Sequence, residues 1–323
     1  MSIWKLRASA IGTLAIIIAL STLAFAVILT LLGVSLVLLI IPVVAFNLIM
    51  WLIAPYITGA MYRVKEVKQN ENPKLYGMVE NLSKKSGVQM PRVMIANIPM
   101  PNAFAYGSPI AGKRLAVTSG LLTTLNDQEV EAVIGHELGH LKHRDVQVMM
   151  FVSILPAIFY YIGISMLFSS MLGGGNKRNS GGAAAIGAAF MAFYFILTLF
   201  TLQLSRTREY YADSHSAAIV DDGARKLSVG LAKIVNATAR GQTRFGQRNN
   251  NHLNAAKALF ISDPDTAAAD ARQIASISDN ELVERVLQRR ITTLDRIHEI
   301  LSTHPNIVKR LRALKELEKE AKA

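Results

Sequence analysis

Residues 126–140 read NDQEVEAVIGHELGH, and this stretch predicts both a helix and a metal site on it. Asn126, with Glu129 three positions later, forms a capping-box pattern that predicts the start of a helix. On that helix His136 and His140 are about 400° apart, so their imidazoles lie on nearly the same face. This spacing predicts two ligands of one metal ion. Glu137, about 100° around the helix, can reach a water on that metal and act as a general base.

A histidine pair on a helix can also be an ordinary exposed or hydrogen-bonded pair. The rest of the chain therefore has to supply a third ligand and a suitable setting. The sequence contains no cysteine. This excludes disulfides and thiolate zinc sites, so any metal must be held by histidines and carboxylates.

Composition places much of the chain in a membrane. Of its 323 residues, 51% are hydrophobic and only 18% are charged, whereas soluble domains carry about 25% charged residues. The apolar residues gather in four runs, each long enough to cross about 30 Å of hydrocarbon as a helix. These runs are 11–32, 34–56, 146–172 and 183–204. The first is longer than the core of a signal peptide, so we expect a retained anchor.

Basic residues predict how the chain is oriented. Lys5 and Arg7 precede the first run, and Arg63, Lys65 and Lys68 follow the second. Because cytoplasmic flanks are enriched in Lys and Arg, the first two runs should form a hairpin with both ends in the cytoplasm. The formal net charge is +12 and we find no nucleic-acid motif. Binding to anionic lipid is the better explanation of this charge.

The predicted fold is a mainly α membrane protein with four transmembrane helices and a cytoplasmic α+β domain. The four predicted segments are a transmembrane hairpin over 8–58, a first cytoplasmic part over 64–145, two further spans over 146–204, and a second cytoplasmic part over 205–323. The first cytoplasmic part should hold the metal-binding helix and a small antiparallel sheet with strands near 92–96, 102–106 and 114–118. A glycine-rich external loop should join the later spans, and helices should cover 279–290 and 307–322.

The spans also predict the third ligand. His140 lies six positions before the start of the third span, and Glu209 lies about four positions after the end of the fourth. If both helices continue, the two side chains sit roughly 6–9 Å outside the membrane, side by side. Two histidines and a glutamate with one open position form a catalytic zinc set. Asp213, four residues after Glu209, is spaced to accept a hydrogen bond from a metal-bound histidine. The alternative is a charged helix with ordinary surface ion pairs.

Four motifs together resemble one family, the HtpX-type membrane metalloproteases, which are relatives of the CAAX prenyl proteases. In chain order these motifs are Asn102-Ala-Phe104, His136-Glu-Leu-Gly-His140, Ser205-Arg-Thr-Arg-Glu-Tyr-Tyr-Ala-Asp213 and Ser302-Thr-His-Pro305. The resemblance implies a zincin-like protease domain with one Zn²⁺ per chain. It implies that His136, His140 and Glu209 bind this ion and that Glu137 activates water. It also implies proteolytic quality control of misfolded membrane proteins in the cell (plasma or inner) membrane.

The resemblance assigns further site residues. Asn102, Ala103 and Phe104 resemble the family's substrate-binding edge strand, although Asn102 could be a plain turn residue. His304 resembles the family's histidine that contacts substrate or stabilises the oxyanion, although it could be a loop histidine before Pro305. The remaining histidines, His143, His215, His252 and His298, match no ligand position. The segment over 263–302 is longer than we expect for the family.

Two other functions stay open at this stage. One is a processing protease of the CAAX type, but its relatives have more than the four spans visible here. The other is a non-catalytic membrane scaffold that keeps a vestigial metal helix. The presence of Glu137 disfavours the scaffold, because a structural site needs no base. The nitrogen and oxygen ligands favour Zn²⁺, but ligands of this type also bind other divalent metals.

Overall fold

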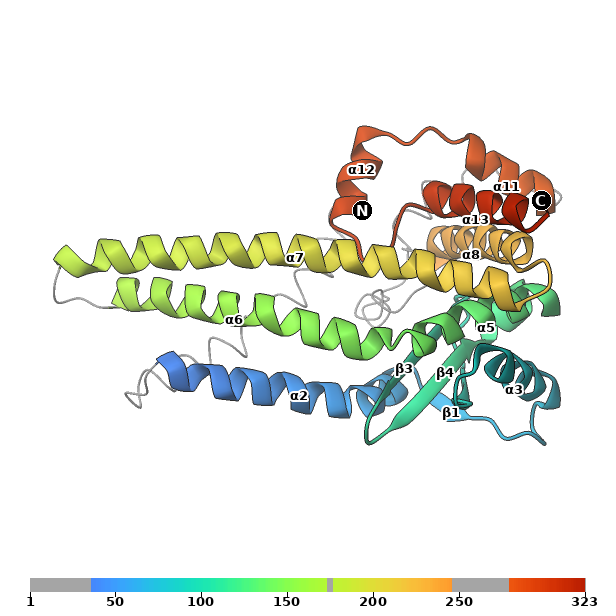
Figure 1. Cartoon of the computed structure of the whole chain (residues 1–323), viewed down its shortest axis with the longest axis horizontal. Coiled ribbons are helices and arrows are strands. Elements are labelled where there is room, and N and C mark those ends of the chain that lie inside the picture. Colours follow the sequence, from blue (N-terminus) through green and yellow to red (C-terminus); the bar gives the residue numbers. More distant parts are fainter. Residues whose placement is uncertain (1–35, 173–176, 246–278, 323) are drawn as a thin grey trace.

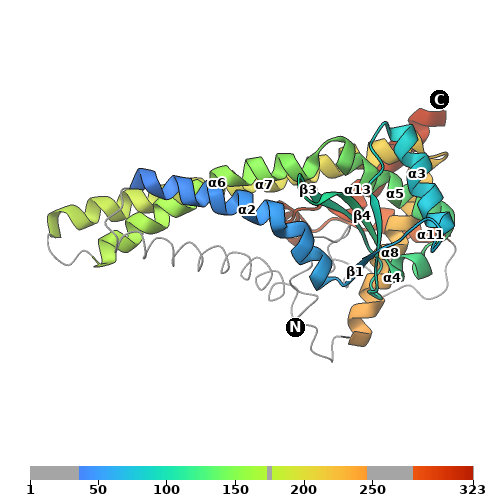
Figure 2. The same ribbon diagram turned by 90° about the horizontal axis from the view of Figure 1, so that it is seen from below.

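Three long helices extend from one end of the molecule, and the other helices gather around a small sheet at the opposite end (Figures 1 and 2). The computed structural model describes residues 36–172, 177–245 and 279–322. The helices are α2 (Leu36–Met61), α3 (Pro73–Ser86), α4 (Ser119–Thr124), α5 (Asp127–Lys142), α6 (Asp145–Leu172), α7 (Lys177–Ile219), α8 (Gly223–Phe245), α11 (Asp279–Gln288), α12 (Thr293–Ile300) and α13 (Ile307–Lys322). The strands are β1 (Val64–Glu66), β2 (Arg92–Ala96), β3 (Ala103–Ser108) and β4 (Gly112–Thr118).

The three long helices contain stretches that are long and apolar enough to cross a bilayer. These stretches are Ile41–Met61 in α2, Asp145–Met171 in α6 and Gly182–Ile219 in α7. Three of the four predicted spans therefore form such helices. The first predicted span, 11–32, lies outside the described residues. The chain is a membrane protein, and its described part has three candidate spans.

Helices α6 and α7 contact each other through glycines. A Cβ atom on Gly187 would lie 2.9 Å from the carbonyl oxygen of Gly163. A Cβ atom on Gly163 would in turn lie 3.1 Å from the carbonyl oxygen of Gly187. Small residues at a helix crossing let the backbones touch, which is how apolar helices associate in lipid. The two helices run side by side along most of their length (Figure 1).

Helix α7 carries the chain out of the bilayer without a break. Its 43 residues span about 64 Å at ~1.5 Å per residue, roughly twice the thickness of a hydrocarbon core. The helix begins at Lys177, so residues 177–182 of the predicted glycine-rich loop are helical. Extending an existing helix costs far less than starting one, which lets a weak sequence join it.

The helix that carries the histidine pair is not an extension of the third span. Helix α5 ends with His143 as its C-cap, and Arg144 adopts a left-handed backbone conformation with φ 55° before α6 begins. A residue in this conformation ends a helix and redirects the chain. The prediction that both helices continue out of the membrane is correct for α7 and wrong for α5.

The sheet is mixed, so the prediction of an antiparallel sheet is wrong. Its strand order is β1-β2-β4-β3, with β2 and β4 parallel at the centre. The reason lies in the connection over 97–102, which crosses the end of β4. Thr118 Oγ1 donates to the carbonyl of Met100 (2.8 Å), and Gly120 N–H donates to that of Ile98 (2.9 Å). The chain therefore enters β3 on the far side of β4, which leaves β3 at an edge.

Helix α5 lies in the core of the domain. The predicted capping box is confirmed, since Asn126 and Glu129 bond each other's backbone N–H groups. The helix buries Val133, Ile134 and Leu138 completely. The predicted apolar stripe of the last helix is also confirmed, because it packs into the same core. The buried members of that stripe are Ile307, Leu311 and Leu314.

Two glycines bring α5 close to α7. A Cβ atom on Gly139 would lie 2.9 Å from Ala212 Cα, and one on Gly135 would lie 3.0 Å from Ser216 Oγ. Both glycines lie one residue before a histidine of the pair. This contact therefore sets how near the imidazoles come to the carboxylates of α7.

We expect Gly139→Ala to lower the free energy of unfolding by about 1–3 kcal/mol, because its Cβ overlaps the α7 backbone. Metal affinity should fall as the helices separate. The control is Gly77→Ala in α3, where a Cβ meets nothing within 4 Å. That change should stabilise the helix by about 0.5–1 kcal/mol. Thermal unfolding of both variants in one detergent checks this. An equal effect of the two changes would contradict the close crossing.

Candidate metal centre

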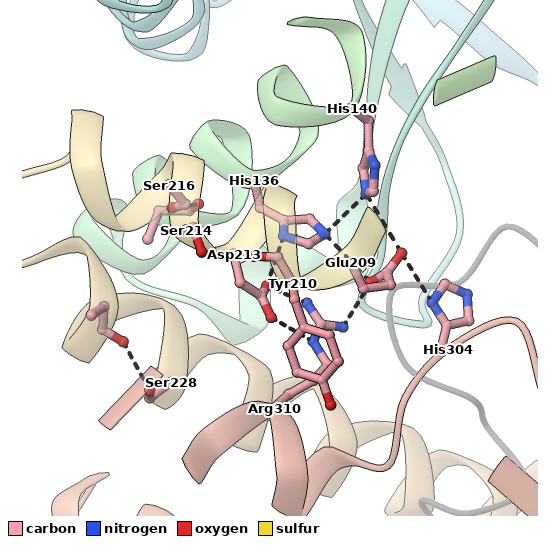
Figure 3. Close-up of polar contacts among 12 residues, drawn as sticks. His136, His140, Glu209, Tyr210, Asp213, Ser214, Ser216, Ser228, His304 and Arg310 are labelled. Carbon is pink, nitrogen blue, oxygen red and sulfur yellow. Dashed lines mark hydrogen bonds and ion pairs between the residues drawn. The ribbon is translucent and has the colours of Figure 1, made fainter. Parts of the chain in front are cut away.

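Three side chains from two helices converge on one point (Figure 3). His136 Nε2 and His140 Nε2, both on α5, lie 3.2 Å apart. The nearest carboxylate oxygens of Glu209, on α7, lie 3.7 Å from the first nitrogen and 3.6 Å from the second. Metal–ligand bonds of about 2.0–2.2 Å place tetrahedral ligands roughly 3.3–3.6 Å apart. The observed separations of 3.2, 3.6 and 3.7 Å are close to the edges of such a tetrahedron, with His136 nearest to Oε2 of Glu209 and His140 nearest to Oε1.

The outer nitrogens of the two imidazoles each face a carboxylate. His136 Nδ1 lies 2.9 Å from Asp213 Oδ1, and His140 Nδ1 lies 2.6 Å from Asp145 Oδ2. A carboxylate partner holds the proton of a neutral imidazole on Nδ1. Each Nε2 is then left without a proton close to Glu209, an arrangement that a shared cation satisfies. The residues present therefore fit a metal ion.

Arg310 supports both carboxylates of α7 from α13. Its guanidinium bonds Glu209 Oε2 at 3.0 Å and Asp213 Oδ1 at 2.6 Å, and its side chain is buried. Burial alone would lower the pKa of Arg310, but Asp213 and Glu209 together raise it above the usual range. The arginine therefore stays charged and holds both carboxylates in place.

Glu137 lies beside the histidines but points toward the sheet. Its Oε2 accepts a hydrogen bond from Ala105 N–H of β3 at 2.8 Å. Burial raises the pKa of the Glu137 carboxyl, and the two imidazoles offset this only in part. One carboxylate oxygen of Glu137 also lies within 4.8 Å of a nitrogen of each histidine. Glu137 can therefore reach a group bound at the point where the three ligands meet.

The strand residues lie next to Glu137. Ala103 and Phe104 begin β3, which is an edge strand of the sheet. Asn102 comes directly before β3 and is fully buried. Thr118 N–H donates to the carbonyl of Asn102 at 2.9 Å. Because antiparallel pairs alternate, the backbone groups of Ala103 and Ala105 face away from β4, and the N–H of Ala105 is bonded to Glu137. The structure buries the side chain of Asn102, so its contact with a substrate stays a prediction.

His304 lies on the other side of Glu209. Its Nδ1 is 3.3 Å from Glu209 Oε1, and its backbone N–H donates to Ser302 Oγ at 3.2 Å. The residue comes from the loop between α12 and α13 (Figure 3). The structure thus brings together five predicted site residues from both halves of the domain, which are His136, His140, Glu209, Asp213 and His304. Asn102, Ala103 and Phe104 lie at the start of the strand whose Ala105 contacts Glu137.

Comparison with known proteins identifies the family of this chain. A model of peptidase family M48 matches residues 69–318. The chain belongs to peptidase family M48. A protease HtpX homolog of Thermoplasma acidophilum is 37% identical over 278 residues, covering 85% of this chain and 83% of that protein. Another, of Aeropyrum pernix, is 39% identical over 277 residues, covering 85% and 84%.

The fold is similar to that of a solved structure. The crystal structure of S. mikatae Ste24p matches with a TM-score of 0.56 and 17% sequence identity. The match covers 97% of this chain and 66% of that one. At this identity the likeness concerns the fold alone. Membership of family M48, the similar HtpX homologs and the apolar helices make this chain a membrane metalloprotease that acts on polypeptides.

Sequence reasoning missed two members of this M48 site. Asp145 follows His140 by five residues, across the break before α6, and Arg208 bonds the same carboxylate. Arg310 lies three residues after Ile307, on the apolar stripe of α13. A charged residue within an apolar stripe is a signal of a buried partner. The signal for Asp145 was weaker, because it required knowledge of the turn at Arg144.

The other histidines lie elsewhere. His215 Nε2 is 3.0 Å from Ser86 Oγ, and its ring centre is 6.2 Å from that of His143. His298 lies on α12, and His252 lies outside the described residues. None of those described takes part in the three-ligand cluster.

We expect Asp145→Asn to weaken metal binding about 10–100-fold, because His140 loses the carboxylate that fixes its proton and orientation. The matched control is Asp127→Asn, which removes an exposed carboxylate paired with Lys74. Competition with a fluorescent metal chelator measures both affinities. Equal affinities in the two variants would show that Asp145 does not orient His140.

Proposed function

We propose that this chain is a zinc-dependent endopeptidase that cleaves misfolded or damaged membrane proteins at the cytoplasmic surface. The observation that carries the proposal is the convergence of His136, His140 and Glu209 at tetrahedral spacing. Two imidazoles and one carboxylate leave a fourth position for water or substrate, as in catalytic zinc sites. The intact Glu137 beside them favours a catalytic site over a structural one.

Glu137 is the proposed general base. A zinc ion held by His136, His140 and Glu209 would acidify water and polarise the scissile carbonyl. The carboxylate of Glu137 takes a proton from the attacking water and passes it to the leaving amine. Its bond to Ala105 N–H holds one oxygen toward the strand. The same side chain therefore lies between the reacting groups and the surface where substrate should lie.

Strand β3 is the proposed substrate-binding edge. An extended polypeptide can add to a free sheet edge through main-chain hydrogen bonds. Ala103 and Ala105 have outward-facing backbone groups; the N–H of Ala105 is bonded to Glu137, and Ala103 lies two residues before it. A segment paired there would pass over the metal centre. Because such pairing reads backbone rather than side chains, it suits unfolded polypeptides of many sequences.

His304 is the proposed contact for the oxyanion. Its imidazole lies 15% exposed beside Glu209, within reach of a carbonyl that is attacked at the centre. A donor aimed at the developing negative charge contributes roughly 3 kcal/mol to catalysis. We assign His304 a second role, which is to hold Glu209 in place, because its Nδ1 lies 3.3 Å from Glu209 Oε1.

The cytoplasmic orientation is supported by charge. Arg63, Lys65 and Lys68 follow the span in α2, on the side that carries the sheet. Arg206 and Arg208 follow the apolar part of α7 on the same side. Segments flanked in this way stay in the cytoplasm.

The test uses the purified full-length chain in lipid bilayers. Chelation should abolish cleavage of an unfolded membrane protein, and Zn²⁺ should restore it where Mg²⁺ does not. A prenylated peptide, tested in parallel, should be a poor substrate. Cleavage that survives chelation would overturn the zinc mechanism. Selective cleavage of the prenylated peptide would overturn the proposed substrate class in favour of CAAX-type processing.

A further inference from the structure

Helix α12 has an exposed apolar face. Its side chains Leu294, Ile297 and Ile300 are 63%, 42% and 49% exposed. Their spacing of three residues places them on one side of the helix. Exposed apolar side chains clustered in this way mark a surface that contacts something other than water.

The opposite face of α12 holds the helix on the soluble domain. Glu299 bonds Lys309 of α13 at 2.5 Å, and Asp295 bonds Arg289, in the segment between α11 and α12, at 2.8 Å. Ile297 is two residues from each of these carboxylates, or about 200° around the helix. The apolar face therefore points away from the domain to which α12 is attached.

Arg206 fixes α12 at the level where α7 leaves the hydrocarbon. Its Nη1 donates to the carbonyls of Glu299, Ile300 and Ser302 at 2.7, 3.0 and 2.8 Å, capping the end of α12. A hydrocarbon core of about 30 Å takes about 20 residues of helix. The apolar part of α7 begins at Gly182. A segment of about 20 residues from there ends about four residues before Arg206. Helix α12 runs across α7 rather than along it (Figure 1).

Charge and size indicate what covers this face. Two exposed arginines lie near this face in the sequence: Arg296 on α12 and Arg290 three residues before the helix begins. The chain as a whole carries a net charge of +12. Amphipathic helices with apolar and basic residues in this arrangement lie in the headgroup region of anionic membranes. Three side chains on an eight-residue helix fall far short of the 20–30 residues a side of a stable protein interface.

We propose that α12 is an interfacial helix that lies in the bilayer surface on the side of the metal centre. Leu294, Ile297 and Ile300 enter the boundary of the acyl chains, and Arg290 and Arg296 contact anionic phospholipid headgroups. The helix then leads through Ser302 to His304, four residues after Ile300. Bilayer contact thus positions the loop that carries His304, independently of which substrate the site takes.

Single-cysteine variants test the depth of α12, since the chain has no cysteine of its own. Ile297→Cys and Leu294→Cys carry an environment-sensitive fluorophore, in bilayers that contain anionic phospholipid. The control is Glu316→Cys, an exposed position on α13. Both α12 labels should show a blue shift and a loss of intensity when quenchers are attached to the lipid acyl chains. The control label should respond only to an aqueous quencher.

Other outcomes identify other occupants, and each overturns the proposal. An α12 label as accessible to the aqueous quencher as the control means that water covers the face. Protection from both quenchers means that protein, such as a second copy of the chain, covers it. A blue shift that requires added unfolded polypeptide means that the face binds substrate. None of these readouts depends on proteolytic activity.

Discussion

Replacing Arg310 by methionine should lower the free energy of unfolding by about 3–5 kcal/mol, the usual cost of removing one partner from a buried ion pair. The guanidinium is buried between Glu209 and Asp213. Methionine fills similar space but leaves two carboxylates close together without a counter-charge. Thermal unfolding of the metal-free protein in detergent, followed by circular dichroism, measures the loss.

The matched control is Arg312→Met on the same helix. Arg312 is exposed, so its replacement should change stability by no more than about 0.5 kcal/mol. Added Zn²⁺ should recover part of the stability lost in Arg310→Met, because a cation at the centre neutralises Glu209. Equal losses in the two variants would show that Arg310 does not hold the carboxylates together.

Replacing Glu137 by glutamine should lower kcat/KM by roughly 10²–10⁴-fold, the usual contribution of a general base. Glutamine keeps the shape of the side chain but cannot take the proton. Zinc content and thermal stability should stay at the wild-type level, because Glu137 is not one of the three proposed ligands. Cleavage of an unfolded membrane protein at saturating and limiting concentrations gives both kinetic constants.

Glu131→Gln makes the same chemical change on the same helix, away from the three-ligand cluster, and should retain wild-type activity. A variant of Glu137 that cleaves as fast as this control would remove the proposed base from the mechanism. A variant that has lost its metal would instead place Glu137 among the ligands.

Local patterns predicted the parts of the site that lie close together in the sequence. The spacing of His136 and His140, the cap at Asn126 and the stripe of α13 each depend on one helix, and a helix has a fixed period. The apolar runs over 34–56, 146–172 and 183–204 likewise predicted helices of membrane-spanning length. Counting residues outward from the spans predicted the proximity of Glu209 to the histidines, but only its premise for α7 is correct.

Contacts between distant segments could not be predicted in the same way. The position of β4 between β2 and β3 depends on how the chain crosses Thr118, which strand alternation does not encode. Arg144 ends the histidine helix although a left-handed conformation is uncommon for arginine. Because of that turn, the side chain of Asp145 lies next to that of His140. The same turn means that α5 is not an extension of the third span, so the predicted height of His140 above the membrane does not hold. Glu209 still meets the histidines, because Gly135 and Gly139 let α5 approach α7.

The most direct test of the central claim is the zinc affinity of three proteins: wild type, Glu209→Gln and Glu137→Gln. If His136, His140 and Glu209 hold one ion jointly, wild type binds one zinc per chain and Glu137→Gln binds it equally well. Glu209→Gln should then bind zinc more than about 100-fold more weakly than wild type. This loss of affinity is larger than the loss caused by removing a residue that only hydrogen-bonds a ligand. Wild-type affinity in Glu209→Gln together with a large loss in Glu137→Gln would contradict the account.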